Sequence, residues 1–563
     1  MAPMDAKVAE TAIAALSDRP ALSLAALLRG KELLAPLEGW EVGKVDASHE
    51  SFQEAWSMFV LALAANPANA EAKTLLESMQ KSQKHDHSHH HHSAAPDRVF
   101  RRPLATTHSF PLDVVVVGAG CSGVGVGFAL TQVFGLDPDR VLLVERGTVG
   151  ETFKRWPKEM RFISPSFNSQ GWTESFDLNS VAYSTSPAFM LHAEHPTGDQ
   201  YAKYLDFIAS FSGLNVRSGT DVTAVRPLEG DEPGFDVEVC PATGGVPTVL
   251  KTRYVIWAAG EFQYPRAAEE PLFPGSELCL HNSSVRSWKE LPGDNFVVVG
   301  GYESGMDAAS NLATCGKQCT VVSSTAYWNI TTADPSAELA PFTGERMRAA
   351  AATKVPPRLL APLRVTAVEA DQDTGGFVVK ATWGPEVAHE NCALREPMTK
   401  PINWRPKNGG EVSLKTPQPP VLCAGFLGSV KQGAVKDLFD WVAPDADDEP
   451  ADDDEDDKPE FDLADADEGD AKPASGCAAG SPLLNEVDES TKVPGLFLVG
   501  PAVRHGKLSF CFVYKFRQRF GVVADAIARG LGRDTTDAVA QCRKTNMFLD
   551  DFECCEGSCQ EGC

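Results

Sequence analysis

The residues with the clearest chemical purpose are three glycines and one acid between positions 113 and 146. Gly118, Gly120 and Gly123 form the pattern Gly-x-Gly-x-x-Gly, and Glu145 ends the next apolar run. The first glycine allows a tight turn, the second lets backbone amides approach a pyrophosphate, and the third lets a helix pack closely on a sheet. The carboxylate of Glu145 can accept hydrogen bonds from a ribose diol. This spacing predicts a dinucleotide-binding site.

Two strands and one helix must position these residues. Val114–Val117 is a run of β-branched residues before the loop, an apolar helical pattern follows it, and Val141–Val144 is the next strand. Together they predict a βαβ unit with the pyrophosphate at the helix N-terminus. Cys121 and Ser122 lie in the loop and Arg146 follows the acid, so we include these three among the predicted cofactor-binding residues.

A second, altered copy of the pattern begins near position 296. A strand at Phe296–Val299 leads into a glycine-rich loop in which Tyr302 replaces the middle glycine, which would reshape the contact with a pyrophosphate. The strand after it ends at Ser323 without an acid that would repel a 2′-phosphate, which favours NADPH over NADH. The predicted cofactor-binding residues of this copy are Gly300, Gly301, Ser304 and Gly305.

The strands around the two loops also repeat. Each copy predicts a hairpin, followed by a strand that ends in two small residues and a glycine. Small residues let the chain pass close to a cofactor, so Ala259 and Gly260 join the predicted site. Two copies imply two dinucleotide-binding units. The first copy comprises residues 222–225, 235–239 and 254–260, and the second comprises residues 365–368, 377–379 and 421–425.

Residues 150–156 read Gly-Glu-Thr-Phe-Lys-Arg-Trp and follow the predicted ribose-binding acid. This run resembles the turn at the same place in flavin-containing monooxygenases and related flavoproteins with two dinucleotide domains. The resemblance implies FAD in the first site, with Thr152, Phe153 and Trp156 beside it. It also makes Asn168 a candidate catalytic residue in contact with the flavin or its oxygen intermediate. A loop asparagine without that role is the alternative.

The resemblance implies a reaction as well as a cofactor. In the family, hydride passes from the nicotinamide to flavin N5, and the reduced flavin binds oxygen as a C4a-hydroperoxide that oxygenates a soft nucleophile. The chain is then expected to be an FAD- and NAD(P)H-dependent oxidoreductase, most closely a flavin monooxygenase with a small-molecule substrate. NADPH is the expected nicotinamide cofactor, ahead of NADH.

The C-terminal strand that ends at Gly500 resembles the closing FAD motif of these flavoproteins. In the family the strand ends in Gly-Asp and the Asp contacts the ribityl chain, whereas Pro501 stands here. Gly500 and Arg504 are the predicted contacts, with His505 or Lys507 as alternatives to Arg504. A basic loop at this place would stabilise an anionic reduced flavin. A surface loop without this role is the other interpretation.

Cysteine chemistry gives the main alternative function. The chain contains 14 Cys, and no secretory signal is evident, which favours reduced thiols over disulfides. Cys121 lies at the predicted helix N-terminus, which would lower the pKa of its thiol, so it is also the candidate catalytic thiol of an FAD-linked thiol or disulfide reductase. The tail could serve as a redox shuttle, bind a soft metal, or do neither. Its cysteines are Cys554, Cys555, Cys559 and Cys563.

A third hypothesis is that the chain is a non-catalytic, flavoprotein-like binding module. Tyr302 in place of a glycine and Pro501 in place of an aspartate support this hypothesis. Residues 1–82 predict helices, and residues 54–80 resemble a tetratricopeptide-type helix pair without the repeat that an array requires. These helices could recruit a protein partner or mediate self-association. The histidine tract at residues 85–92 has no fixed geometry, so we expect no functional metal site.

Composition limits the classes of partner. The net charge of -26 argues against nucleic acid, and no run of about 18 apolar residues predicts a membrane span. Without a recognisable targeting segment, the expected location is the cytoplasm. Residues 445–470 consist mainly of Asp, Glu, Pro and Ala and predict a disordered, solvated insertion.

The predicted fold is α/β, with two Rossmann-like dinucleotide-binding domains for FAD and NAD(P)H and an N-terminal helical appendage. The predicted boundaries are 1–82 for the appendage, 83–110 for the His-rich linker, 111–290 for the first part of the FAD-binding domain, 291–425 for the NAD(P)H-binding domain, 426–485 for a connection with the acidic insertion, 486–545 for the C-terminal part of the FAD-binding domain, and 546–563 for the Cys-rich tail.

Overall fold

The computed structural model describes residues 28, 31, 55, 70–75, 110–166, 177–183, 185–230, 233–268, 270–329, 338–384, 410–442, 480–506 and 508–552. The chain divides into two compact units, Met1–His108 with Phe167–Ala193, and Ser109–Ser166 with Glu194–Cys563. The first unit includes a helical stretch at residues 70–75 and helix α7 (Pro187–Leu191). The His-rich linker, the acidic insertion and the cysteines of the tail lie outside the described residues, as does most of the predicted N-terminal helix pair.

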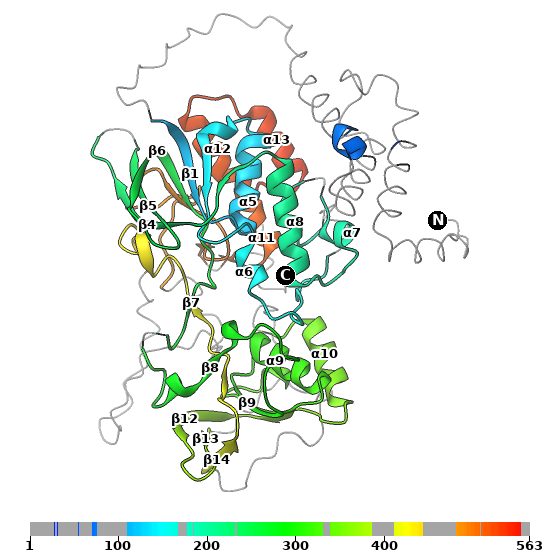
Figure 1. Ribbon diagram of the computed structural model, residues 1–563. Helices are drawn as coiled ribbons and strands as arrows, with labels where there is room; N and C mark the ends of the chain where they lie inside the picture. Colours follow the sequence, from blue (N-terminus) through cyan, green and yellow to red (C-terminus); the bar gives the residue numbers. More distant parts are fainter. Residues whose placement is uncertain are drawn as a thin grey trace, which may run out of the picture. The chain divides into compact units, whose positions relative to one another are not determined.

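The larger sheet of the second unit has seven strands. They are β1 (Leu112–Val117), β2 (Val141–Val144), β3 (Asn215–Arg217), β4 (Thr220–Pro227), β5 (Phe235–Pro241), β6 (Thr248–Trp257) and β17 (Leu496–Leu498). The strands β3-β2-β1-β6-β17 are parallel in that order. The start of β6 pairs antiparallel with β5, which pairs with β4, so one long strand joins the hairpin to the parallel part (Figure 1).

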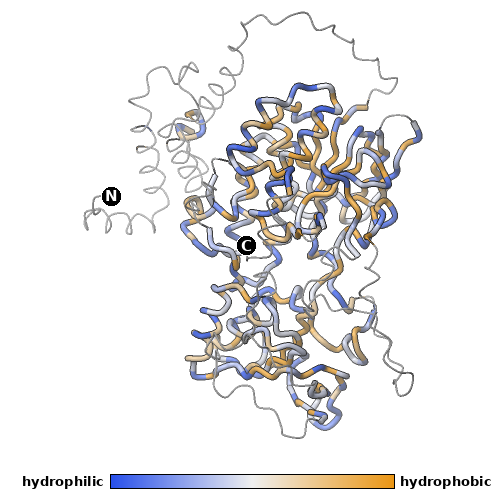
Figure 2. The backbone as a smooth tube through the Cα atoms, turned by 180° about the vertical axis from the view of Figure 1, so that it is seen from behind, coloured by the Kyte–Doolittle hydropathy of each residue, from blue (hydrophilic) through white to orange (hydrophobic). Residues whose placement is uncertain are grey.

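Three helices pack together beside this sheet. They are α5 (Cys121–Phe128), α8 (Gly198–Phe211) and α12 (Phe520–Gly530), and both α8 and α12 contact α5 (Figure 1). Thr197 caps α8: its hydroxyl oxygen accepts the backbone N–H of Gln200 at 3.1 Å. A Cβ on Gly125 would lie 2.1 Å from the ring of Phe520, so this glycine lets α12 approach α5. Hydrophobic residues run through the buried strands (Figure 2).

The second sheet repeats the plan of the first. Its parallel strands are β8 (Leu280–His281), β9 (Asn295–Val299), β10 (Gln318–Val322), β11 (Arg358–Leu360) and β15 (Val421–Leu422), and its antiparallel partner sheet is β12 (Leu363–Ala370), β13 (Phe377–Trp383) and β14 (Glu411–Thr416). The parallel order is β11-β10-β9-β15-β8. Pro419 and Pro420 separate β14 from β15, because proline cannot donate to a sheet ladder, so the counterpart of β6 is broken here.

Helices α9 (Glu303–Thr314) and α10 (Pro341–Ala351) pack on each other beside the second sheet. The duplicated order confirms an α/β fold with two Rossmann-like units, while the N-terminal helical appendage stays a prediction. The shorter elements are the π-helical turn Ala129–Val133, α6 (Glu151–Lys154), β7 (Tyr264–Pro265), β16 (Phe426–Leu427), β18 (Arg504–His505), β19 (Leu508–Ser509), α11 (Val513–Phe516), α13 (Thr536–Lys544) and the 3₁₀ turns at 138–140, 276–278, 282–284, 327–329, 433–435 and 517–519.

Candidate cofactor-binding site

Two glycines of the first loop are required by close packing. Gly118 has a φ of 103°, and a Cβ there would lie 2.6 Å from the carbonyl oxygen of Ala258 at the end of β6. A Cβ on Gly123 would lie 2.0 Å from the carbonyl oxygen of Gly118. The Gly118 N–H donates to the Val144 carbonyl at 2.8 Å. The loop is therefore fixed between the carboxyl ends of β2 and β6.

Gly120 has a different role. Its φ is -79°, which any residue can adopt, and no atom lies within 4 Å of the place where its Cβ would be. No atom of the described residues therefore fills the space beside Gly120. A pyrophosphate would approach the N-terminus of α5 through this space. The open position and the helix N-terminus fit the pyrophosphate of FAD.

The carboxylate of Glu145 lies beside this opening. Its two oxygens accept the backbone N–H of Ala119 at 2.8 Å and of Gly147 at 2.7 Å. Burial raises the pKa of Glu145, and the two backbone hydrogen bonds oppose that rise. Because a carboxylate offers about four lone-pair sites, Glu145 can still accept ribose hydroxyls. Arg146, also predicted as a contact, is exposed.

The C-terminal return meets the first loop at Gly500. The residue has a φ of 110°, and a Cβ there would lie 2.6 Å from the Oγ of Ser122. Gly500 and Ser122, predicted separately, are thus neighbours. The guanidinium of Arg504 donates to the carbonyl oxygens of Pro501 and, at 2.9 Å, Val503, so its described hydrogen bonds stay within its own loop.

The aromatic residues after Glu145 form a packed cluster. Phe153 is buried, and its ring centroid lies 5.1 Å from that of Trp156 and 4.8 Å from that of Tyr201 in α8. This packing accounts for both aromatic side chains without a ligand. A cofactor contact by Phe153, Trp156 or the half-buried Thr152 therefore stays a prediction. Asn168 lies outside the described residues.

Ala259 lies next to the loop: its Cα is 3.1 Å from the position of a Cβ on Gly118. Gly260 follows with a φ of 75°, which turns the chain away from the sheet. The carbonyl oxygen of Ala259 accepts the side-chain amide of Gln263. The strand-end turn predicted from small residues is therefore present at the first loop.

The second loop reproduces the packing of the first. Gly300 has a φ of 105°, and a Cβ there would lie 2.4 Å from the carbonyl oxygen of Cys423, the counterpart of Ala258. A Cβ on Gly305 would lie 2.0 Å from the Gly300 carbonyl oxygen, and one on Gly301 would lie 2.6 Å from Ser323. Ser304 is half-buried. The backbone turn and the helix N-terminus thus fit a dinucleotide.

Tyr302 stands where the first loop has Gly120. Its hydroxyl donates to the Glu338 carbonyl oxygen at 3.1 Å, and its ring centroid lies 5.0 Å from that of Tyr327. The side chain is thus fixed against neighbouring segments of its own domain.

The helix N-terminus does not lower the thiol pKa of Cys121 as expected, and a catalytic role for this residue stays a prediction. The residue begins α5, but burial of its thiol raises the pKa to about 11, and the hydrogen bonds with Ser122 only partly oppose that rise. The cost of placing a thiolate away from water exceeds the benefit of the helix N-terminus. Cys315 and Cys319, at the end of α9 and in β10, have raised thiol pKa values for the same reason.

We expect Cys121 to react slowly with iodoacetamide. With a pKa of about 11, roughly one thiol in a thousand is ionised at about pH 8. The alkylation rate of the flavin-free protein, followed by peptide mass spectrometry, should rise about tenfold per pH unit throughout the range below the pKa. A plateau in the rate near neutral pH would contradict the buried-thiol interpretation.

A buried ion pair behind the C-terminal return was not predicted. Asp488 and Arg519 are both fully buried, and their side chains form two hydrogen bonds of 2.9 Å. His505 Nε2 lies 2.5 Å from Asp488 Oδ1, and the Asp488 carbonyl oxygen accepts the Leu498 N–H at 2.9 Å. The pair therefore supports the strand that delivers Gly500 to the loop. No sequence signal could have revealed it, because Asp488, His505 and Arg519 lie in three separate segments.

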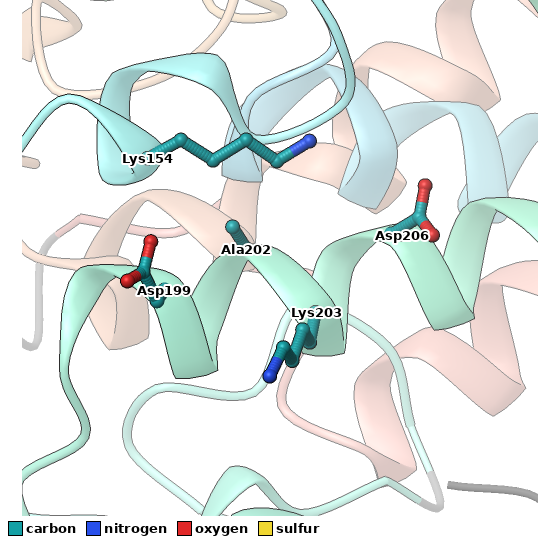
Figure 3. A pocket seen from close by; sticks show the side chains of 5 residues that line it. All are labelled: Lys154, Asp199, Ala202, Lys203 and Asp206. Carbon is teal, nitrogen blue, oxygen red and sulfur yellow. The ribbon is translucent and has the colours of Figure 1, made fainter.

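One pocket is lined by residues that were not predicted to bind the cofactor. It has a volume of about 300 Å³ and lies between α6 and α8 (Figure 3). Two lysines and two aspartates balance its charge, and Lys154 lies across from the residues of α8. Its lining residues are Lys154, Asp199, Ala202, Lys203 and Asp206. Within the described part of the chain, no cluster of His, Cys, Asp and Glu is arranged to hold a metal, and no helix could cross a membrane.

Known proteins resemble the chain in sequence and in structure. The chain is 27% identical over 251 residues to the indole-3-pyruvate monooxygenase YUCCA1 of Oryza sativa subsp. japonica, a match that covers 43% of the chain and 52% of the relative. It thus spans about half the length of that curated relative. Similar solved structures include the bacillithiol disulfide reductase of Staphylococcus aureus, with 15% identity, a TM-score of 0.49 and coverage of 75% of this chain and 99% of that one. The ornithine N-hydroxylase of Kutzneria sp. 744 has 14% identity, a TM-score of 0.49 and coverage of 74% and 99%.

A family model for pyridine nucleotide-disulphide oxidoreductases matches residues 115–393, which include both glycine-rich loops. Over that range the chain is similar to this family, and it resembles the flavin-containing monooxygenases and related oxidoreductases with two dinucleotide-binding domains.

Proposed function

We propose that this protein is an FAD- and NAD(P)H-dependent oxidoreductase, and within that class a flavin monooxygenase that acts on a soft nucleophilic small molecule. The observation that carries the proposal is the first loop, where Gly118 and Gly123 fix the turn and Gly120 leaves the ligand position open. The sequence similarity to an indole-3-pyruvate monooxygenase supports the monooxygenase assignment. The proposed site of action is the cytoplasm.

The bound flavin would supply the redox chemistry and the activation of oxygen. The chain's own groups would bind and orient it. The amides at the start of α5 face the pyrophosphate, Glu145 accepts the ribose hydroxyls, and Gly500 lets the C-terminal return approach the loop. For the nicotinamide cofactor we favour NADPH over NADH, because β10 is followed by Ser323 and Ser324 instead of an acid.

The second candidate function is that of a disulfide reductase. The match to the pyridine nucleotide-disulphide oxidoreductase family favours this candidate. Such an enzyme needs a thiolate near the flavin, and burial of Cys121 works against one. Under our proposal the Cys121→Ser variant keeps its NADPH oxidation rate. Under the reductase hypothesis that variant loses disulfide-dependent NADPH oxidation.

The deciding experiment is anaerobic reduction of the FAD-loaded protein by NADPH, followed by mixing with oxygenated buffer in a stopped-flow spectrometer. A long-lived absorbing species that differs from oxidised and reduced flavin would support the C4a-hydroperoxyflavin of a monooxygenase. Immediate return of the oxidised spectrum would contradict that assignment and favour a reductase. If NADPH does not reduce the flavin at all, the oxidoreductase proposal fails and the non-catalytic module remains.

A further inference from the structure

The first turn of α9 has an acid where the first turn of α5 has a neutral thiol. Glu303 follows Tyr302 in the second loop and corresponds to Cys121 in the first. We propose that binding of a nicotinamide dinucleotide at the second loop is coupled to the uptake of one proton by the carboxyl group of Glu303. This inference rests on the proposed function, because it concerns the nicotinamide site.

The carboxylate of Glu303 is bound to the start of the neighbouring helix. One oxygen accepts the backbone N–H of Ala340 at 2.6 Å, and the other accepts the hydroxyl of Thr343 at 2.6 Å. Tyr302 contacts the same segment through its hydrogen bond to the Glu338 carbonyl. Glu303 is therefore fixed at the entrance to α9 and cannot turn away from a ligand without breaking both bonds.

A dinucleotide would bring negative charge to the same place. The pyrophosphate of a dinucleotide binds at the N-terminus of the helix that follows the glycine-rich loop, next to the first-turn residues. At α5 that first-turn residue is the uncharged Cys121, whereas at α9 it is Glu303. With an ionised Glu303, the ligand and the protein would place like charges side by side.

Among the residues that the structure describes, the charged groups around Glu303 provide no cation that lacks other partners. The charge of Arg346 in α10 acts on Glu303, but Arg346 donates to Asp307 at 2.7 Å and to Asn311 at 2.9 Å. Asp307, one turn further along α9, adds a second acid. Arg161 of the FAD-binding domain lies beyond, near Arg346 and Asp307, and donates to backbone carbonyls. The other titratable groups near this helix start are Glu338, Tyr327 and Cys423.

The surroundings of Glu303 in the free protein already raise the pKa of its carboxyl group. Burial raises the pKa of Glu303 and Asp307 adds to the rise, while the hydrogen bonds from Thr343 and Ala340 and the charge of Arg346 oppose it. A neighbouring phosphate would raise it further. The proton comes from solvent and attaches to one carboxyl oxygen, while the other oxygen can keep the Ala340 N–H. The new O–H can then donate to a phosphate oxygen.

The sign of the pH dependence follows. Dinucleotide affinity is weakest where Glu303 is ionised even in the complex, and it increases as the pH falls through the pKa of the complex. It becomes constant below the pKa of the free protein. Proton uptake is greatest between these two pKa values, where the dissociation constant changes by up to about tenfold per pH unit.

Isothermal titration of NADP⁺ into the FAD-loaded protein tests this directly. At each pH the titration is run in two buffers of different ionisation enthalpy, so that the difference in heat gives the protons taken up. We expect net uptake in the wild type and a smaller uptake in Glu303→Gln, which keeps the side-chain size. At high pH Glu303→Gln should bind NADP⁺ about tenfold more tightly than the wild type. The difference in proton uptake between the wild type and Glu303→Gln excludes the protons that the ligand itself takes up or releases.

Glu345→Gln is the matched control, because it removes the same charge from an exposed position on α10. It should behave as the wild type. Equal uptake in the wild type and Glu303→Gln, or weaker binding by Glu303→Gln at every pH, would overturn the proposal. Absence of proton uptake by the wild type would also overturn the proposal, and this test does not depend on any variant. If NADP⁺ does not bind, this proposal fails, and reduction of the flavin by NADPH reports separately on the proposed function.

Discussion

The Gly120→Ala variant is expected to fold as the wild type does and to lose most of its affinity for FAD. Without ligand, a methyl group at this position meets no atom within 4 Å, and the φ of -79° suits alanine. With FAD, the methyl group occupies the space through which the pyrophosphate approaches the backbone amides. Loss of a hydrogen bond to a charged group costs about 1.5–3 kcal/mol, so the dissociation constant should rise by about 10- to 100-fold.

The measurement pairs thermal unfolding of the flavin-free protein with titration of FAD by fluorescence quenching. Gly344→Ala in α10 is the control. A Cβ on Gly344 would lie 3.7 Å from the nearest atom, and Gly344 is far from the loop in the sequence. Gly123→Ala gives the opposite result, because its Cβ would lie 2.0 Å from the Gly118 carbonyl oxygen. That variant should unfold at lower temperature even without FAD. Unchanged FAD affinity in Gly120→Ala would show that the cofactor does not bind at this loop.

Asp488→Asn is expected to destabilise the protein by about 3–5 kcal/mol, because it leaves the buried guanidinium of Arg519 without its counter-charge. Both side chains have no exposed surface in the folded protein. Asp488 has a φ of 63°, a conformation that asparagine also adopts, so the substitution changes the charge with little change in backbone strain. The loss should appear in the free energy of unfolding from urea denaturation.

Asp525→Asn is the matched control for this prediction. Asp525 pairs with Arg529, whose side chain is 65% exposed, one turn along α12. Exposed pairs of this kind contribute about 0.5 kcal/mol or less. Because Asp488 also holds the strand before Gly500, Asp488→Asn should weaken FAD binding as well, and Asp525→Asn should not. Equal stability of the two variants would contradict the role assigned to the buried pair.

Local sequence was sufficient to predict the framework of the site. The glycines at 118, 123, 300 and 305 could be recognised because their spacing within each loop is a local pattern. The β-strands around them could be recognised because alternation and β-branched residues are also local. The same holds for the cap at Thr197, where a hydroxyl and the helix start are neighbours in the chain. The sequence therefore determined the duplicated α/β fold and the place of the first glycine-rich loop.

Only the tertiary structure decided the state of the charged and ionisable groups. The sequence placed Cys121 at a helix N-terminus and so suggested a reactive thiol, but burial of the thiol raises its pKa to about 11. The contacts of Glu303 with α10 and the pairing of Asp488 with Arg519 likewise join residues that are 31 to 40 positions apart. Desolvation and ion pairing depend on which segments contact each other in the folded protein, and a local sequence pattern does not predict those contacts.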